Sequence, residues 1–477
     1  MHYVTDLHLH SKYSRAVSPQ MTLPVMAQVA RQKGLDVLSA SDFTHPVWFK
    51  EISEQLEEAE EGLYTLKFEY QNPKSETNAN FQNINEQKQI RFMLSTEISS
   101  IYKQGDRVRR IHNLVFVPSL EVAEKFNKAL IKRGANLTAD GRPIVGLSAR
   151  DLLELLLSID ERAFIIPAHI WTPHFGVYGS ASGFDSLEEA YGDLAPQIFG
   201  IETGLSSDPA MNWQVPELST RSILSFSDAH SAPKMGREAT VVDLESLSYT
   251  NIRKAFARPS VIARNEAIAT KESSVRIASS SATPRNDKYP NKIAYTLEFY
   301  PEEGKYHFSG HRNCKVVQGP EHIHANGNIC PVCSRRMTEG VLFRVQQLAD
   351  GKLLHRTEAK LRPDGLKWYT DTTHVQPPYV KLVPLLEIIA ESLGSSVNSQ
   401  KSKNLYATLC SELGSELQVL LHASVTDIER VGGGKVAQAV TKVRAGTISI
   451  EPGYDGVYGK VSIWNKGKDV PQLRLEI

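Results

Sequence analysis

Tyr3-Val4-Thr5-Asp6-Leu7-His8-Leu9-His10, near the start of the chain, is the stretch that decides the fold. Its pattern predicts a strand, on which residues i and i+2 point to one face. His8 and His10 therefore point together, while Leu7 and Leu9 point the other way. Two imidazoles on one side of a rigid strand supply half of a metal site, since neutral imidazole is the commonest metal ligand. Two polar residues on a hydrated strand face would show the same pattern, so the rest of the chain has to decide.

The composition is that of a globular protein. The 477 residues are 41% hydrophobic and 23% charged, which suits about two to four domains. No apolar run approaches the roughly 18 residues of a membrane helix, and no secretory signal pattern is present, so we expect a cytoplasmic protein. Lys and Arg number 54, as do Asp and Glu. The total charge therefore gives no argument for nucleic acid, and any such binding must use a local patch.

Residues of ligand type recur at the ends of later predicted strands. These strands are Val37–Ser41 with Asp42 after it, Phe92–Glu97, Ile111–Val117 with His112, Phe164–His169, Phe199–Glu202, and Ser222–Ser227 followed by Asp228 and His230. Helices are predicted over Thr22–Arg31 and Trp48–Leu63, and from Leu120 and Ser148. Strands that alternate with helices indicate an α/β protein with parallel strands. The length suits one (β/α) barrel, whose active site gathers at the carboxyl ends of its strands.

Eight of these side chains form a candidate metal centre. His112 alone would more simply be a structural residue, but a set at equivalent strand ends predicts two or three divalent ions, Zn, Mn or Mg. Glu97 can bridge two of them. Whether His45 and Glu202 bind metal or orient the ligands is left open. The predicted ligands are His8, His10, Asp42, Glu97, His112, His169, Asp228 and His230.

The order and spacing of these motifs resemble the PHP (polymerase and histidinol phosphatase) superfamily. The resemblance rests on His8-Leu9-His10, Asp42, Glu97 with His112, His169, and Asp228-Ala229-His230. It implies a distorted (β/α)7 barrel over residues 1–262 that holds a trinuclear metal centre.

Longer stretches are similar to the endonuclease Q family within that superfamily. They are Ser41–Pro46, Pro167–Pro173, Glu202–Pro209, Ser227–Ser231, Lys305–Arg312 and Glu451–Gly459. Members nick DNA on the 5′ side of deaminated bases such as uracil, hypoxanthine and xanthine, and at abasic sites. The resemblance implies that Glu97, Asp228 and His230 are catalytic. His174-Phe175-Gly176 departs from the Trp-Phe expected there, which leaves the shape of the pocket rim open.

Residues 289–382 contain a predicted zinc-binding module. Cys330-Pro331-Val332-Cys333 is a CxxC knuckle, and Cys314 lies 16 residues before it. A structural zinc site needs four ligands, so we expect a histidine as the fourth. His311 gives an H-x-x-C knuckle and is our choice, with His307, His322 and His324 as alternatives. A redox CxxC is disfavoured because no thioredoxin-like βαβ unit surrounds it.

A modest excess of Lys and Arg in this module suits contacts with DNA phosphates. A charged run is more often only a hydrated face. Our candidate DNA-binding residues are Arg312, Lys315, Arg335, Arg336, and Trp171 and His174 beside His169. Arg344 is a further candidate for a phosphate contact.

Residues 383–477 predict a mainly helical DNA-contacting segment. Helices are expected over Leu382–Leu393, Ser402–Leu413 and Asp427–Arg444. Gly432-Gly433-Gly434-Lys435 is a poor match to a phosphate loop and is a simple helix start or a helix-hairpin-helix turn. A sliding clamp is left open as a partner, but residues 471–477 lack the usual aromatic pair and do not support it.

The resulting hypothesis is a metal-dependent DNA repair endonuclease, cytoplasmic and nucleoid-associated, whose partner is DNA with deaminated or abasic nucleotides; no membrane partner is expected. The alternative is a PHP-type phosphomonoesterase for a small substrate, which would need neither the zinc module nor the C-terminal helices. A non-catalytic DNA-binding protein with a decayed barrel is disfavoured, because every ligand motif is filled.

Residues 263–288 predict an exposed inserted loop. The stretch begins Arg264-Asn265-Glu266, closes Arg285-Asn286-Asp287, and has no apolar period. It resembles a translated palindromic repeat inserted in frame. We expect deletion of residues 263–288 to leave nuclease activity intact, because no ligand lies there; a folded deletion variant without activity would contradict this.

Overall fold

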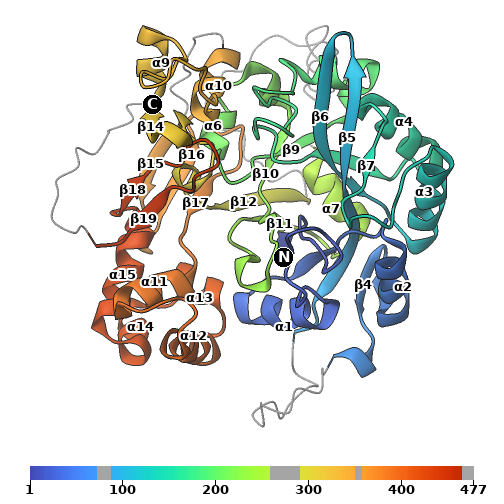
Figure 1. Ribbon diagram of the computed structural model, residues 1–477. Helices are drawn as coiled ribbons and strands as arrows, with labels where there is room; N and C mark the ends of the chain where they lie inside the picture. The colour runs from blue at the N-terminus through green and yellow to red at the C-terminus, as the bar shows by residue number, and fades with distance from the viewer. Residues whose placement is uncertain (72–87, 258–290, 350–356, 465–477) are drawn as a thin grey trace, which may run out of the picture.

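The computed structural model describes residues 1–71, 88–257, 291–349 and 357–464 (Figure 1). The predicted insertion at 263–288 and residues 471–477 lie outside these ranges. The strands are β1 His2–Asp6, β2 Val37–Ala40, β3 Leu56–Glu60, β4 Leu63–Leu66, β5 Arg91–Gln104, β6 Arg107–Phe116, β7 Ile144–Val145, β8 Phe164–Pro167, β9 Gly200–Glu202, β10 Ser222–Leu224, β11 Ala239–Asp243, β12 Lys292–Glu298, β13 Ser309–His311, β14 Val316–Gln318, β15 Thr357–Leu361, β16 Lys367–Asp371, β17 Tyr379–Lys381, β18 Ser449–Glu451 and β19 Lys460–Ser462.

Helices cover the sheet and form the C-terminal part. They are α1 Leu23–Lys33, α2 Pro46–Gln55, α3 Leu120–Lys132, α4 Ala149–Ile159, α5 Leu187–Tyr191, α6 Pro209–Asn212, α7 Tyr249–Phe256, α9 Pro320–Asn326, α10 Val341–Leu348, α11 Leu385–Leu393, α12 Gln400–Leu413, α13 Glu416–Leu421, α14 Val425–Gly432 and α15 Gly434–Ala445. Short 3₁₀ turns lie at η1 Phe68–Tyr70, η3 Gly192–Gln197, η4 Pro216–Thr220, η5 Ala232–Lys234, η6 Pro301–Glu303 and η7 Arg312–Cys314. In the described residues, no helix is both long and apolar enough to cross a membrane.

A single large sheet organises the molecule, with strand order β15-β16-β17-β12-β11-β1-β2-β5-β4-β3. The predicted parallel arrangement holds in its centre, where β1 pairs with β2 and β2 with β5. Beyond it, β6 runs antiparallel to both β5 and β8. The fold is therefore mixed α/β, as the sequence predicts, but not uniformly parallel.

Strand pairing does not close the predicted seven-stranded barrel in the described residues. β9 and β10 pair only with each other. Just beyond the strand ends, Ile170 N–H donates to Glu202 C=O at 3.0 Å on one side of this pair. On the other side Leu9 forms an isolated parallel bridge with Ala229, whose C=O accepts the His10 N–H at 3.3 Å. The barrel expectation is thus met only in part, because the chain leaves the ladder at the residues that carry the candidate ligands.

The helix predicted over Trp48–Leu63 is wrong in its second half. Helix α2 ends at Gln55, and Leu56 takes an extended conformation. The acidic stretch that follows becomes β3, which pairs antiparallel with β4 at the edge of the sheet. Gly62, with φ of +66°, makes the turn between them. Pairing with a neighbouring strand overrides the helical propensity of Glu-rich sequence.

The C-terminal helices pack against the first helix of the chain. α12 and α13 contact α1, and a buried ion pair lies in this contact, with Lys33 Nζ 2.7 Å from Glu416 Oε2. Glu416 also accepts hydrogen bonds from the Tyr406 hydroxyl at 2.8 Å and the Leu385 N–H at 3.0 Å. The Glu416 carboxylate therefore joins helix α1 to the C-terminal helices α11, α12 and α13.

We expect Glu416→Ala to lower the free energy of unfolding by about 3–5 kcal/mol, because it leaves the Lys33 ammonium buried without a counter-charge. Urea denaturation followed by circular dichroism measures this loss. Glu54→Ala, which breaks the exposed Lys50–Glu54 pair, is the control and should change stability by less than about 0.5 kcal/mol. Equal effects of the two substitutions would contradict the role given to Glu416.

Candidate metal centre

The candidate centre begins just beyond the end of β1. The strand ends at Asp6, and the extended chain continues to place His8 and His10 on one side, 1% and 0% exposed. Leu7 and Leu9 are equally buried, in two different hydrophobic clusters. The opposite faces predicted from the sequence are thus both covered, one by apolar side chains and one by the other candidate ligands.

Three candidate ligands have a left-handed backbone. Asp42, His169 and Asp228 have φ of +58°, +29° and +47°. Each follows shortly after a strand, and the left-handed turn redirects the chain there. Such conformations cost about 1–3 kcal/mol and persist where the surroundings hold them. At Gly141 a Cβ atom would lie 2.5 Å from Asp42 Oδ2, so the loop over Asp42 tolerates no side chain there.

The imidazoles and carboxylates of the centre form three overlapping groups in the described residues, within each of which the ligand atoms lie within 4.8 Å of one another. Glu97 belongs to two groups and lies on β5, while His112 lies on the adjacent strand β6. Glu97 Oε1 is 2.6 Å from His112 Nδ1 and 3.1 Å from His169 Nε2. The groups are His8, His10 and Glu97; His10, Asp228 and His230; and Glu97, His112 and His169.

These distances fit divalent ions. Two ligands of a tetrahedral ion, each about 2.0–2.1 Å from it, lie about 3.3 Å apart. His10 Nε2 lies 3.1 Å from Asp228 Oδ1 and 3.4 Å from Glu97 Oε2. His8 Nε2 and His169 Nδ1 are buried and have no hydrogen-bond partner. Because an unpaired buried nitrogen is costly, a bound cation would account for the His8 atom, which points at the carboxylates.

Two of the predicted residues lie outside these groups. Asp42 approaches His10 from the other nitrogen, with Oδ1 3.4 Å from Nδ1, and its Oδ2 accepts hydrogen bonds from the Ser11 N–H and Ser14 hydroxyl. His45 stacks on Tyr13, with ring centroids 4.5 Å apart. In this structure Asp42 therefore orients His10, and His45 lies to the side.

Glu202 contacts two of the candidate ligands, His8 and His169. Its Oε1 lies 2.8 Å from His8 Nδ1, and its Oε2 accepts the His169 N–H at 2.6 Å. The fully buried Glu202 carboxylate therefore fixes the imidazole ring of His8 and the left-handed backbone of His169. This is the position of a residue that orients metal ligands.

Arg142 is a functional candidate that the sequence analysis missed. Its guanidinium donates to Glu97 Oε2 at 3.2 Å, and its side chain is 26% exposed. Nothing in the local sequence distinguishes Arg142 from other loop arginines. The Asp140-Gly141-Arg142 turn, with a glycine that lies against Asp42, is the one signal that could have indicated it.

Burial and opposite charge act against each other at these groups. Burial lowers the pKa of His8, but the neighbouring carboxylates, Glu202 first, hold it well above its ordinary value. Burial raises the pKa of Glu97, yet His112 and Arg142 hold it well below its usual range. For His112 burial prevails and lowers the pKa to about 4. Near pH 7 Glu97 is therefore ionised and His112 neutral, the forms that bind a cation, whereas His8 has to release a proton when it binds a cation.

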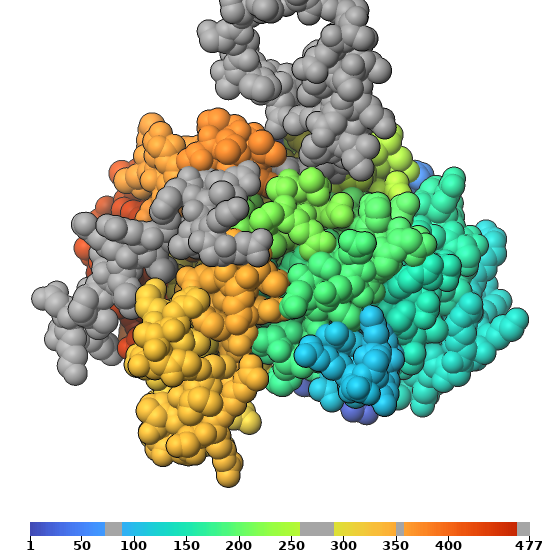
Figure 2. Space-filling view, turned by 90° about the horizontal axis from the view of Figure 1, so that it is seen from above, coloured from blue at the N-terminus to red at the C-terminus, as the bar shows by residue number. Residues whose placement is uncertain are grey.

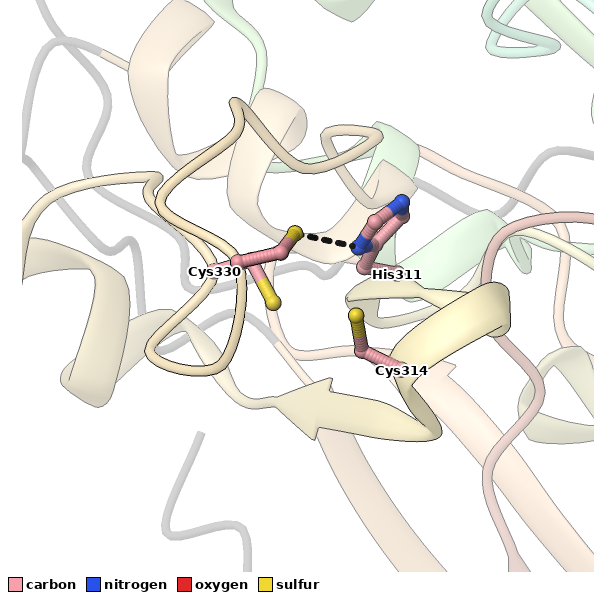
Figure 3. Close-up of side chains that lie close together, drawn as sticks. His311, Cys314 and Cys330 are labelled. Atoms are coloured by element: carbon pink, nitrogen blue, oxygen red, sulfur yellow. Dashed lines mark hydrogen bonds between the residues drawn. The ribbon is translucent and has the colours of Figure 1, made fainter.

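The four residues chosen for the zinc knuckle also lie together. The ligand atoms of His311, Cys314, Cys330 and Cys333 are within 4.8 Å of one another, and His311 Nδ1 is 3.3 Å from Cys333 Sγ. Figure 3 shows His311, Cys314 and Cys330 pointing toward a common space. The surrounding cluster has only three fully buried members, so an ion would supply the cohesion that the core lacks.

The alternative histidines have other contacts. His307 Nδ1 lies 3.2 Å from the Ser206 carbonyl oxygen, and His324 Nε2 lies 3.2 Å from Gln346 Oε1. The chosen set thus has the donor atoms of a closed Cys₃His site.

The candidate DNA-binding residues separate into two classes. Arg312, Lys315, Arg335, Arg336 and His174 are exposed. Trp171 is 2% exposed, and its indole N–H donates to Asn212 Oδ1 at 2.8 Å. The expectation that Trp171 contacts DNA is corrected, because its ring lies in the core.

The expectation that Arg344 contacts a DNA phosphate is also corrected, because its guanidinium is used within the protein. It donates to the Tyr178 and Phe184 carbonyls and pairs with Asp185. Arg344 therefore attaches the zinc module to the loop over residues 178–185.

The chain is similar to known proteins along most of its length. A family model described as the MJ0043 C-terminal domain matches residues 384–447. The Methanocaldococcus jannaschii protein MJ0043 is 29% identical over 314 residues, 64% of this chain and 33% of MJ0043, so the chain spans about a third of that protein. Bacillus subtilis YqxK is 26% identical over 469 residues, 96% of this chain and 98% of YqxK.

Solved structures give the same picture. The lesion-specific endonuclease PfuEndoQ from Pyrococcus furiosus is similar with a TM-score of 0.72 and 28% identity, over 97% of this chain and 95% of PfuEndoQ. Endonuclease Q in complex with a 27-mer duplex substrate with an abasic lesion at the active site gives a TM-score of 0.74 and 28% identity, over 99% of this chain and 100% of that one. Both likenesses extend from the first strand through the C-terminal helices.

We expect Glu202→Gln to weaken metal binding by about 10–100-fold, because the amide keeps the size of the side chain but loses the charge that orients His8. Titration of metal-free protein with Zn²⁺ or Mn²⁺ measures the affinity. Glu154→Gln on the exposed face of α4 is the control. Wild-type affinity in Glu202→Gln would contradict the orienting role.

Proposed function

We infer that this chain is a member of the endonuclease Q family, which its sequence motifs predict and its similarity in fold to endonuclease Q supports, and on that premise we propose that it is a metal-dependent DNA repair endonuclease. It hydrolyses the phosphodiester bond 5′ to a deaminated base (uracil, hypoxanthine or xanthine) or an abasic site. Water attacks phosphorus, the bond to the 3′ oxygen breaks, and the ends are a 3′-hydroxyl and a 5′-phosphate.

The observation that carries this proposal is that the three ligand groups are linked, because each of them contains His10, Glu97 or both. They lie in a fold similar to that of an endonuclease Q bound to a duplex with an abasic lesion. Two or three divalent ions, Zn, Mn or Mg, would suit the groups, and Glu97 belongs to two of them. The residues that would hold the ions are His8, His10, Glu97, His112, His169, Asp228 and His230. When bound, such ions activate water and neutralise charge that develops on the phosphate.

The protein's own residues complete the chemistry. Glu202 and Asp42 hold the imidazoles of His8 and His10 in fixed orientations. Arg142 reaches Glu97 with one N–H and has further donors, in a side chain partly open to solvent. We assign Arg142 to a non-bridging oxygen of the scissile phosphate, because a guanidinium binds phosphate in a fixed geometry and keeps its charge.

The zinc module and the C-terminal helices supply DNA contact in this proposal. A zinc ion held by His311, Cys314, Cys330 and Cys333 would be structural. The exposed side chains of Arg312, Lys315, Arg335 and Arg336 would contact DNA phosphates. The lesion leaves the stack so that the protein can read its edge, and damaged or mispaired bases are the cheapest to extrude. His174 remains the rim candidate. A protein that acts on DNA in this way would lie in the cytoplasm, in association with the nucleoid. We do not propose that it binds a sliding clamp.

The test is strand nicking of a labelled duplex that carries one uracil, hypoxanthine or abasic site, with an undamaged duplex beside it. We expect cleavage 5′ to the lesion with Mg²⁺ or Mn²⁺ and none with chelator. Asp228→Asn should lower the rate at least about a hundredfold, since ion stabilisation is worth several kcal/mol and each ~1.4 kcal/mol is tenfold. The exposed Asp151→Asn is the control.

Turnover of p-nitrophenyl phosphate without nicking of any duplex would replace this function by the phosphomonoesterase alternative. Nicking that persists in chelator would show that the metal assignment is wrong.

A further inference from the structure

The β5–β6 hairpin extends beyond the sheet and is not used by the chemistry proposed above. Its two strands pair continuously from Ser95↔Phe116 to Gln104↔Arg107. Gly105, with φ of +57°, and Asp106 make the turn. In Figure 1 the hairpin rises at the upper end of the molecule, and in Figure 2 its blue tip faces the viewer on the same side as the gold zinc module.

The base of this hairpin is the metal centre itself. Glu97 lies on β5 and His112 on β6, and both belong to the third ligand group. Directly opposite residues of an antiparallel pair share a face, and so do residues i and i+2. The face of Glu97 and His112 therefore continues outward through the pairs Ile101↔Arg110 and Lys103↔Val108.

Two cations on that face have no ion-pair partner in the described parts of the chain. Lys103 is exposed and Arg110 half-buried, and neither side chain has a carboxylate within reach. Arg109, on the opposite face, differs: it donates to the Gly183 carbonyl and lies over the Phe184 ring at 3.9 Å. Arg109 thus attaches one face of the hairpin to residues 183–184. On the other face, which carries Glu97 and His112, the charges of Lys103 and Arg110 are not neutralised by a carboxylate of the described residues.

The spacing places these charges along one line that leads outward from the candidate metal centre. A strand advances about 3.3–3.4 Å per residue, so Arg110 lies about 7 Å from His112 and Lys103 lies about 13–14 Å from Ser99, the residue opposite His112. A DNA strand whose scissile phosphate is at the metal centre has further phosphates at increasing distance along its backbone. In a chain of zero net charge, a row of unpaired cations there fits a polyanion.

We propose that the metal-side face of the β5–β6 hairpin binds the phosphate backbone of the strand to be cut, through Arg110 and then Lys103, next to the scissile phosphate. The proposal rests on the proposed function and names the contact that sets the register of the nicked strand. Val108, which lies directly opposite Lys103 and is 50% exposed, would face the sugars. Contacts of this kind position DNA without reading its sequence.

The test is equilibrium binding of a duplex with one abasic site, measured in chelator so that cleavage does not enter, across a range of salt. Each phosphate contact contributes about 0.9 to the slope of log K against log salt. We expect the double variant Lys103→Gln, Arg110→Gln to lose about two from the slope. Lys128→Gln, Lys132→Gln on α3 is the control for equal charge loss and should keep the wild-type slope.

A second measurement locates the contact. A neutral methylphosphonate replaces in turn each phosphate within three nucleotides of the scissile one on the cut strand. In the wild type we expect one or two positions to weaken binding, and in the hairpin variant those same positions to have no further effect, because the two losses share one interaction. Bound-metal content, by mass spectrometry, and the thermal midpoint confirm that the variant is folded.

Equal slopes for the hairpin variant and the α3 control, or additive losses at every methylphosphonate position, would overturn the hairpin proposal. These outcomes differ from failure of the proposed function, which is absence of nicking by the wild type. Loss of bound metal in the hairpin variant would also overturn it, because the effect would then come from displaced Glu97 and His112.

Discussion

The carboxylate of Glu97 is the interaction on which the rest of the structure depends. It is fully buried, and the imidazoles of His112 and His169 and the guanidinium of Arg142 surround it. A buried charge is tolerated only when it is compensated. The chain meets this requirement from strands and loops far apart in sequence, and the left-handed backbone at His169 shows that strain is accepted to do so. The same constraint creates a site whose natural occupant is a cation.

The zinc module and the C-terminal helices contact the first part of the chain separately. The module continues the large sheet through the pairing of β12 with β11, and Arg344 adds contacts with the backbone of residues 178–185. The Lys33–Glu416 pair joins α13 to α1. Both of these side-chain contacts place a charged group against partners that must fit closely, so each fixes an orientation more than it adds stability. In consequence the basic residues of the module and the β5–β6 hairpin have defined positions relative to the metal centre, which a rigid DNA duplex would require.

The sequence predicted several local elements, and seven of the eight residues that it predicted as ligands lie together in the structure. Strands β2 and β8 lie where apolar runs indicated them, because burial on both faces leaves a continuous hydrophobic signal. The strand predicted over Phe92–Glu97 is present, but β5 continues to Gln104, and its half-buried to exposed end gives no such signal. The stretch after Gln55 was assigned to a helix, since its glutamates favour one and the pairing of β3 with β4 is invisible in local sequence. The prediction that Trp171 contacts DNA was wrong for a related reason. Its position close to His169 along the chain does not show which way its side chain points.

By itself, the sequence determined which residue types stand at the ends of the strands, and hence the chemistry of the centre, because strand periodicity and spacing are local properties. Only the tertiary structure decided which of them meet. It placed Asp42 behind His10, Glu202 against His8, and Arg142 beside Glu97, and it left the barrel incompletely paired. Those contacts join residues up to 194 positions apart, as for His8 and Glu202, and the closing of such long loops leaves no periodic pattern in the sequence.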